Sequence, residues 1–238
     1  TVGVYVFSAG GAAVAESFSR IGDRQWAVVS GISAAVLGLV SSIVYLRLFK
    51  RTSAVSVFLI VLFLELTTTD IIKIIHVAPA ADLVYRESLL IGRVILAGHM
   101  LSVMALFGAG VYAAGIRFQR HGAVLGVALL LAGGLSSAVP LDPQGLGRNL
   151  VHTPVVASNV PLIFALLLVV SVVSYLQNAI RDRDGRLILN AIAIGALALG
   201  RELLFYAWSP WHVGLGASLY AVGVFMYARR NYRDYIVG

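Results

Sequence analysis

Four ionisable residues lie close together at the end of an apolar segment: Glu65, Asp70, Lys73 and His76. A charged side chain inside a bilayer costs roughly 2.5–3.5 kcal/mol on insertion scales unless it is paired or hydrated. Carboxylate, ammonium and imidazole groups in an apolar setting are suited to moving protons or binding a polar ligand. We therefore expect the chemistry of this chain in the stretch 65–79, with the other segments supplying partners for its charges.

The spacing of these residues predicts a polar stripe on one face of a helix. At about 100° per residue, Glu65, Thr69, Lys73 and His76 fall within a face roughly 80° wide, and Asp70 lies beside it. The remaining faces carry Ile, Leu, Val and Phe, which suit lipid or neighbouring helices. The stripe is therefore expected to point into a bundle that closes around it.

The composition indicates an integral membrane protein. Of the 238 residues, 59% are hydrophobic and only 12% are charged, whereas soluble domains carry about 25% charged residues. The net charge of +7 is accounted for by basic residues that flank apolar spans, and no basic, aromatic-rich patch predicts nucleic-acid binding. The absence of cysteine excludes disulfides, thiolate metal sites and a cysteine nucleophile.

Apolar segments of suitable length predict an all-α, polytopic fold with seven transmembrane helices. A helix needs about 20 residues to cross the roughly 30 Å hydrocarbon core, where its backbone groups must be satisfied internally. Residues 1–25 are expected to form an external segment, residues 26–230 the bundle, and residues 231–238 a short cytoplasmic tail. The spans are expected at about 26–49, 53–77, a third that ends near 116, 122–139, 160–176, 187–208 and 211–228.

Lysine and arginine in the loops predict the orientation in a plasma (inner) membrane. Most of them fall on one side, so the positive-inside rule places the N-terminus outside and the C-terminus in the cytoplasm. Trp26, Trp208 and Trp211 would then all lie at the outer interface. The basic side holds Arg47, Lys50, Arg51, Arg117, Arg120, Arg181, Arg183, Arg186, Arg229, Arg230 and Arg233, and the other side holds Arg20, Arg24, Arg86 and Arg148.

A possible internal repeat relates the first three spans to the last three. The matches occur at three shifts that follow chain order, which predicts a parallel 3+1+3 arrangement with the fourth span as a linker. The alternative is chance, because apolar segments punctuated by Gly and Arg match easily. At shifts of 130, 131 and 113 residues respectively, Tyr45 matches Tyr175, Pro79 matches Pro210, and His99 matches His212.

Depth along the helices predicts two polar groupings. Glu65 and Arg201 lie about 21 and 22 Å from basic residues at the cytoplasmic side, so we expect a buried ion pair between them, either structural or engaged with protons or a ligand. A second grouping is expected to form a water-filled pocket for a small polar or anionic ligand near the outer boundary. The alternative is that these side chains reach the headgroups separately. The pocket residues would be Asp70, Lys73, His76, His99, Arg201 and His212.

The histidines leave one cofactor open, and otherwise we expect none. Haem requires two axial imidazoles at one depth, which His99 or His76 can supply together with His212. Hydrolysis would require a serine that faces a histidine, and Ser102 lies near His99, but no GxSG motif supports that pair. An enzyme is therefore the less favoured reading, although the sequence leaves it open.

The expected layout resembles that of two families of seven-helix membrane proteins, the SWEET and PQ-loop transporters and the microbial rhodopsins, and it is similar to bacterial seven-helix sensor modules. The first family carries its Pro-Gln signature in a helix, whereas Pro143-Gln144 falls in the loop after the fourth span. The second needs a lysine in the last helix for retinal, and residues 211–228 contain none.

Two hypotheses for the function follow. The first is binding, and possibly transport, of a small polar or anionic solute in a pocket open to the outer side. The second is a non-enzymatic sensory or structural membrane subunit that acts through a partner protein or a second copy of the chain. The nearly apolar inner halves of the spans weaken transport, and the many polar groups at the outer end favour a bound ligand.

Overall fold

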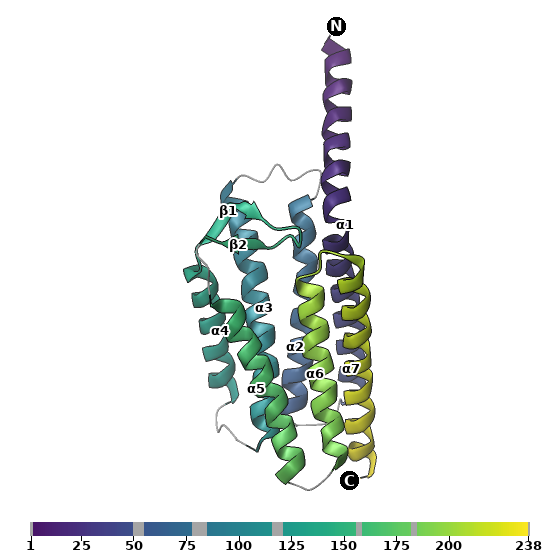
Figure 1. Cartoon of the computed structure of the whole chain (residues 1–238), viewed down its shortest axis with the longest axis vertical. Helices are drawn as coiled ribbons and strands as arrows, with labels where there is room; N and C mark the ends of the chain where they lie inside the picture. The colour runs from purple at the N-terminus through teal and green to yellow at the C-terminus, as the bar shows by residue number, and fades with distance from the viewer. Residues whose placement is uncertain are drawn as a thin grey trace.

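The computed structural model describes residues 2–49, 55–77, 85–115, 121–155, 159–181 and 185–237. These residues form a bundle of long helices with a small β-hairpin at one end (Figure 1), and we call this end the hairpin end. The elements are α1 (Val2–Leu48), α2 (Val55–Thr67), the 3-10 helix η1 (Thr68–Val77), α3 (Tyr85–Ala113), α4 (His121–Ala138), β1 (Leu141–Leu146), β2 (His152–Pro154), α5 (Val160–Arg181), α6 (Gly185–Phe205) and α7 (Pro210–Val237).

Within the described residues, six stretches are long and apolar enough to cross a membrane, which agrees with an all-α, polytopic membrane protein. The apolar part of α4, Leu125–Ala138, is shorter. Many large apolar side chains face outward, as lipid contact requires; Leu130 on α4 is 77% exposed and Leu162 on α5 is 69% exposed. The six stretches are Arg24–Leu48, Val55–Val77, Arg86–Ala113, Pro161–Arg181, Leu187–Phe205 and Pro210–Asn231.

The helices at the two ends of the chain extend across the expected segment boundaries. An external segment was expected to end at residue 25, but α1 continues without a break from Val2 to Leu48. This part of the chain contains no proline to interrupt the helix. At the other end, α7 continues to Val237, so most of the expected tail 231–238 belongs to the last helix.

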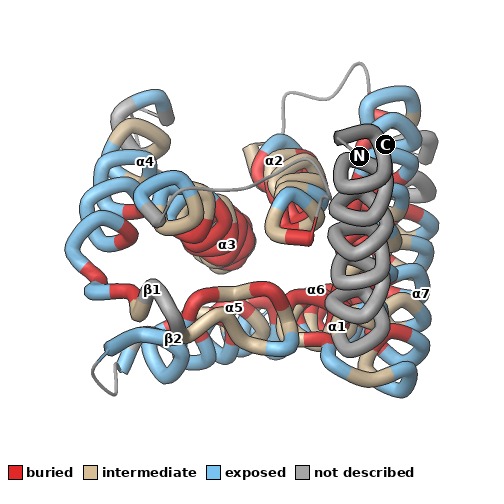
Figure 2. The backbone as a smooth tube through the Cα atoms, turned by 90° about the horizontal axis from the view of Figure 1, so that it is seen from above, coloured by how far each residue is buried: buried red, intermediate tan, exposed pale blue. Residues whose placement is uncertain are grey.

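The helices pack in a defined order around the buried residues. α1 packs against α7, α2 and η1, α3 packs against α2, α4 and α5, and α6 packs against α5 and α7. Seen from above, α4 lies at the edge of the bundle beside α3, while α1 and α7 lie side by side (Figure 2). α1 begins on the side of the hairpin end and α7 finishes at the opposite end (Figure 1).

The second span changes its helix type at a run of threonines. The hydroxyls of Thr67, Thr68 and Thr69 donate to the carbonyls of Phe63, Glu65 and Leu66 at 2.9, 2.6 and 2.7 Å. Such side-chain bonds compete with the backbone ladder and bend or tighten helices. Residues 68–77 accordingly form a 3-10 helix with about three residues per turn.

Two glycines let α1 lie directly against the second span. A Cβ atom at Gly38 would stand 2.7 Å from the carbonyl oxygen of Leu64, and one at Gly31 would stand 3.0 Å from the carbonyl oxygen of Asp70. Small residues at such contacts are a common means of close helix packing in membranes. They bring the backbone of α1 against the segment that carries Asp70.

The loop after α4 folds into an antiparallel hairpin, which the sequence pattern did not predict. Leu141 pairs with Pro154 and Leu146 pairs with His152, with an irregular register between them. Leu150, in the turn, is fully buried and packs in one cluster with Ala27 of α1 and Val77 of η1. The hairpin therefore packs against the middle of α1 and the end of η1.

Three buried tyrosines meet at the opposite end of the bundle, and we call them the tyrosine cluster. The rings of Tyr45 on α1 and Tyr175 on α5 each lie with their centroids 6.2 Å from that of Tyr227 on α7. The hydroxyl of Tyr45 donates to the carbonyl of Val224 at 3.0 Å, and those of Tyr175 and Tyr227 are 3.4 Å apart. Neutral phenols thus connect three helices there.

Candidate functional site

Asp70 is the centre of a buried charged group near the hairpin end. Both of its carboxylate oxygens accept hydrogen bonds from Arg201 on α6, Oδ2 from Nη1 at 2.9 Å and Oδ1 from Nη2 at 3.0 Å. This two-point geometry is the strongest that a guanidinium and a carboxylate can form. Because each side chain is only 1% exposed, the pair connects η1 with α6 inside the bundle.

Lys73 is the second cation of this group. Its Nζ lies 3.4 Å from Oδ2 of Asp70 and donates a hydrogen bond of 2.8 Å to the carbonyl oxygen of Phe205. Phe205 is the last residue of α6, where carbonyls lack partners within the helix and the helix dipole favours a cation. Lys73 therefore caps α6 as well as pairing with Asp70.

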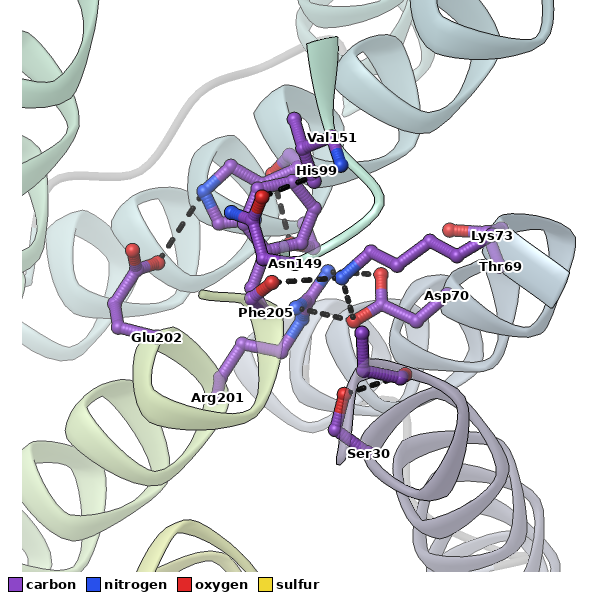
Figure 3. Close-up of polar contacts among 12 residues, drawn as sticks. Ser30, Thr69, Asp70, Lys73, His99, Asn149, Val151, Arg201, Glu202 and Phe205 are labelled. Atoms are coloured by element: carbon purple, nitrogen blue, oxygen red, sulfur yellow. Dashed lines mark hydrogen bonds and ion pairs between the residues drawn. The ribbon is translucent and has the colours of Figure 1, made fainter. Parts of the chain in front are cut away.

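The ring of Phe205 separates the charged pair from a buried histidine. Lys73 Nζ lies 3.9 Å from the ring centroid and the guanidinium carbon of Arg201 lies 5.1 Å from it, distances at which cation–π attraction operates. The imidazole of His99 on α3 stacks on Phe205 with a centroid distance of 3.8 Å. Figure 3 shows Asp70, Lys73, Arg201, Phe205 and His99 converging in this way. We call these five residues, with Glu202, the charged cluster.

The register of η1 explains why these residues meet. At about three residues per turn, positions 67, 70 and 73 lie one above another on a single face. Thr67, Asp70 and Lys73 are in fact all buried, with exposures of 0%, 1% and 0%. Asp70 thus lies at the centre of the polar face, whereas the α-helical stripe had placed it at the side.

Glu202 completes the charge balance of the cluster. Its Oε1 lies 3.4 Å from Nε2 of His99, and neither this oxygen nor either nitrogen of His99 has a hydrogen-bond partner within the described part of the chain. With His99 neutral, the carboxylates of Asp70 and Glu202 balance the cations Lys73 and Arg201. Buried polar atoms without partners are rare in native proteins and call for an explanation.

A groove between α5 and α6 reaches Glu202. It has a volume of about 390 Å³, and its lining is apolar except for Glu202 and Tyr206. The side chain of Glu202 is still 23% exposed, so the carboxyl group joins the buried cluster to this groove. Burial raises the pKa of Tyr206 to about 12, so its hydroxyl remains protonated. The apolar lining is formed by Pro161, Ala165, Leu168, Val169, Val172, Val173, Gly195, Ala198 and Leu199.

The ion pair expected between Glu65 and Arg201 does not form in the structure, because Arg201 pairs with Asp70. Glu65 instead accepts a hydrogen bond of 2.7 Å from the hydroxyl of Ser42 on α1. The expectation assumed α-helical geometry throughout the second span, but the 3-10 segment turns Asp70 inward and brings it closer to the hairpin end.

Some of the basic residues used to predict the orientation lie outside the described residues. These are Lys50, Arg51 and the loop arginines 117, 120 and 183.

The expected pocket residues divide into two groups. The structure brings together Asp70, Lys73, His99 and Arg201, but it does not place His76 or His212 with them. His76 packs edge-on against His152 of β2, with ring centroids 5.4 Å apart. His212 lies 2.6 Å from the hydroxyl of Ser209 through Nδ1 and packs against Trp208.

The two tryptophans at the turn from α6 to α7 are exposed. Trp208 and Trp211 are 54% and 84% exposed, so these rings face outward and do not cover the charged cluster. Lys73 and Arg201 are buried and shared with Asp70, so neither cation is presented to water. Each of the three histidines His76, His99 and His212 contacts different neighbours. Within the described residues, no group of three or more His, Asp or Glu side chains is placed to hold a metal ion.

Sequence reasoning missed two features of the site. Phe205 places its ring between the two cations and His99, and its carbonyl accepts a hydrogen bond from Lys73. No sequence pattern around Phe205 predicts these contacts. The central position of Asp70 had one, since Thr67, Asp70 and Lys73 repeat every three residues directly after a threonine run. Likewise, Ser102 donates to the backbone carbonyl of His99 at 2.8 Å, so it does not face that imidazole as a nucleophile would.

Comparisons of the chain with protein-family models, with curated proteins and with solved structures return no match. The geometry of the charged cluster and its groove is therefore the basis for assigning a function.

Proposed function

We propose that this chain is a multi-pass membrane protein that binds a small amphiphile in the groove between α5 and α6. The observation that carries the proposal is the position of Glu202, a half-buried carboxyl group at an otherwise apolar groove of about 390 Å³. Ligand sites are typically apolar concavities with a few polar groups that fix the orientation. The apolar body of the ligand would lie between the helices, and its polar head would reach Glu202 and Tyr206.

The charge distribution favours a head group that donates hydrogen bonds over an anionic one. Asp70 and the carbonyl of Phe205 already occupy Lys73 and Arg201, so neither cation is available to an anion. An anionic head in the groove would instead meet the carboxylate of Glu202. A hydroxyl or amine head group can donate a hydrogen bond to the carboxylate of Glu202. We therefore propose an amphiphile with a hydrogen-bond donor as its head group, in place of the polar or anionic solute expected from the sequence.

A sensory role is the second candidate and is favoured by the connection between the groove and the charged cluster. Glu202 follows Arg201 directly in α6, and the same helix end carries Phe205. A ligand that draws Glu202 away from His99 would move the last turn of α6. Asp70 and Lys73 hold this turn through Arg201 and Phe205. Transport has less support, because the core between the charged cluster and the tyrosine cluster contains buried apolar residues such as Phe63, Leu106 and Leu197.

Photo-crosslinking with two matched probes tests the proposal. The full chain in lipid nanodiscs is labelled with a diazirine-bearing fatty alcohol or with the fatty acid of the same length, and the modified peptides are located by mass spectrometry. We expect the alcohol to label α5 and α6 preferentially, and Glu202→Leu to reduce that labelling at least about fivefold. Glu87→Leu, which removes an exposed carboxyl on α3, is the matched control and should have no effect.

Two results would contradict the proposal. Alcohol labelling spread evenly over all lipid-facing helices would show that the groove is only part of the lipid boundary. Stronger labelling of α5 and α6 by the fatty acid would show that the site prefers an anionic head, as first expected from the sequence.

We further propose seven crossings, with the N-terminus outside and the C-terminus in the cytoplasm of a plasma membrane. Arg47 and Arg181 lie in the last turns of α1 and α5, which supports one basic side, and α4 has 18 residues. Cysteines introduced singly at Arg148 in the hairpin and Arg229 on α7 should react with an impermeant thiol reagent from outside and from inside, respectively. The opposite pattern would overturn the orientation.

The 3+1+3 duplication also remains a proposal, and the packing supports it. Under the repeat, α1 corresponds to α5 and α3 to α7, and the contacts of α1 with α7 and of α5 with α3 are then equivalent. The matched residues Tyr45 and Tyr175 both contact Tyr227. A repeat sequence detectable in related chains at the same three shifts would establish it.

A further inference from the structure

A serine and a histidine from distant parts of the chain meet at the hairpin end. The hydroxyl oxygen of Ser88, in the first turn of α3, lies 2.9 Å from Nε2 of His152 on β2. The other ring nitrogen of His152, Nδ1, lies 2.9 Å from the backbone carbonyl oxygen of Asp142 on β1. His152 is only 3% exposed, so the surrounding structure holds its imidazole in place.

These two contacts determine which nitrogen of His152 carries the proton. A carbonyl oxygen can only accept a hydrogen bond, so Nδ1 must be the protonated nitrogen and must donate to Asp142. Nε2 then keeps its lone pair and accepts from the hydroxyl of Ser88. A nucleophile bonded to a base that a third group orients is the arrangement that activates serine for covalent catalysis.

The sequence of α3 makes room for this pair. Gly92 lies one helical turn after Ser88 and on the same face, and a Cβ atom there would stand 2.7 Å from Cδ2 of His152. The imidazole therefore lies directly against the helix backbone at Gly92 while its Nε2 reaches Ser88. Pairing of Leu146 with His152 in the hairpin fixes the backbone that carries the ring.

Ser88 lies in the first turn of α3, and an apolar cavity touches His152. Ser88 is the fourth residue of α3, within the turn where backbone N–H groups lack partners inside the helix and can stabilise a developing oxyanion. A cavity of about 130 Å³ touches His152 and Gly92 and is lined mainly by apolar groups, among them Leu141 and Pro154. Its size and its mainly apolar lining suit a short acyl chain.

We propose that Ser88 and His152 form a nucleophile–base pair that hydrolyses small carboxylic esters at the hairpin end of the bundle. This activity does not rest on the amphiphile site, since its reacting groups are Ser88 and His152 and not Glu202; the two cavities adjoin and share Pro161 and Tyr206 in their linings. Asp142 acts as a positioning residue through its carbonyl, and Gly92 positions the ring by allowing its close approach.

The chemistry is an acyl transfer to water. Oγ of Ser88 attacks the ester carbonyl carbon while its proton passes to Nε2 of His152. The bond from that carbon to the leaving oxygen breaks, and His152 returns the proton to this oxygen, which releases the alcohol. Water then attacks the acyl-serine with His152 again taking a proton, and the carboxylic acid leaves as the proton returns to Ser88.

A fluorophosphonate probe tests the pair, because an activated serine displaces fluoride from its phosphorus. The full chain in nanodiscs is treated with the probe, and the modified residue is identified by mass spectrometry. We expect the adduct on Ser88 in the unaltered protein and at least about a tenfold slower reaction in His152→Gln. Ser102→Ala is the matched control, because Ser102 also lies on α3 near a histidine but donates to the backbone carbonyl of His99, and the labelling of this variant should equal that of the unaltered protein.

Hydrolysis of p-nitrophenyl acetate and of p-nitrophenyl butyrate gives the second readout, and Ser88→Ala should abolish it while Ser102→Ala retains it. An unaltered protein that forms no adduct on Ser88 would overturn the proposal whatever the variants do. Equal labelling of Ser88 in the unaltered protein and in folded His152→Gln would also overturn it, since the serine would then react without its base and the contact would serve only to attach the hairpin to α3.

Discussion

The two ends of the bundle join their helices by different means. Near the hairpin end, the charged cluster uses one carboxylate, Asp70, to hold two cations, and each of these groups is essentially without solvent exposure. At the other end, the tyrosine cluster connects α1, α5 and α7 with neutral rings that need one hydrogen bond each. Removing a tyrosine hydroxyl leaves an apolar ring in place, whereas removing the carboxylate of Asp70 leaves two buried cations without it.

This contrast shows where the molecule accepts a change and where it does not. Breaking a buried ion pair is expected to cost about 3–5 kcal/mol because the remaining charge stays buried and uncompensated. A neutral hydrogen bond contributes only about 0.5–1.5 kcal/mol net. The hairpin end should therefore respond to single substitutions far more strongly than the tyrosine end, and it is also the end that carries both proposed sites.

The largest effect is expected for Asp70→Ala, which leaves Lys73 and Arg201 without their shared carboxylate. We expect a loss of about 3–5 kcal/mol in the free energy of unfolding, measured by thermal unfolding of the detergent-solubilised protein. The double variant Asp70→Leu with Arg201→Leu should lose less than the sum of the two single variants, because these residues are in direct contact.

Glu65→Ala is the matched control for that experiment, since Glu65 is the other carboxylate of the second span and bonds only to Ser42 within the described contacts. It should destabilise the protein less than Asp70→Ala. A larger effect of Glu65→Ala would restore the pairing first expected from the sequence and would contradict the contrast between the two ends.

A smaller effect is expected for Arg201→Lys, which keeps the charge but removes the two-point contact with Asp70. Loss of one charge-assisted hydrogen bond should cost about 1.5–3 kcal/mol, again measured by thermal unfolding. If Arg201→Lys were as stable as the unaltered protein, charge alone would hold the cluster and its geometry would be unimportant.

Tyr45→Phe tests the opposite end. It removes the 3.0 Å hydrogen bond to the carbonyl of Val224 but keeps the ring packed, so we expect a loss of about 0.5–1.5 kcal/mol. Tyr45→Leu, which also removes the ring stacking on Tyr227, should cost more than Tyr45→Phe. Equal losses would show that the hydroxyl, and not the ring, connects the helices here.

The smallest effect is expected for Tyr227→Phe. The contact between its hydroxyl and that of Tyr175 measures 3.4 Å, at the long limit for an O–H···O hydrogen bond, so the loss should lie below about 0.5 kcal/mol. A loss as large as that of Arg201→Lys would show that the tyrosine cluster is as sensitive to substitution as the charged cluster. The distinction between the two ends would then be wrong.

Composition and span length, read from the sequence alone, determined the class of the protein and the ends of most helices. These are local properties, because a helix must satisfy its backbone within itself and must be apolar over about 20 residues to cross a bilayer. The expected span 160–176 lies within α5, and 187–208 overlaps α6. The same reasoning grouped Asp70, Lys73, His99 and Arg201 with His76 and His212 in one pocket; the first four meet, and the other two histidines have different neighbours.

Only the tertiary structure decided which of these residues are partners. Asp70 replaced Glu65 as the partner of Arg201 because the threonine run changes the second span from about 100° to about 120° per residue, and the partner itself comes from α6. The contact of Ser88 with His152 joins positions 64 residues apart. Such contacts depend on how the helices pack against one another, and no periodicity along the chain encodes them.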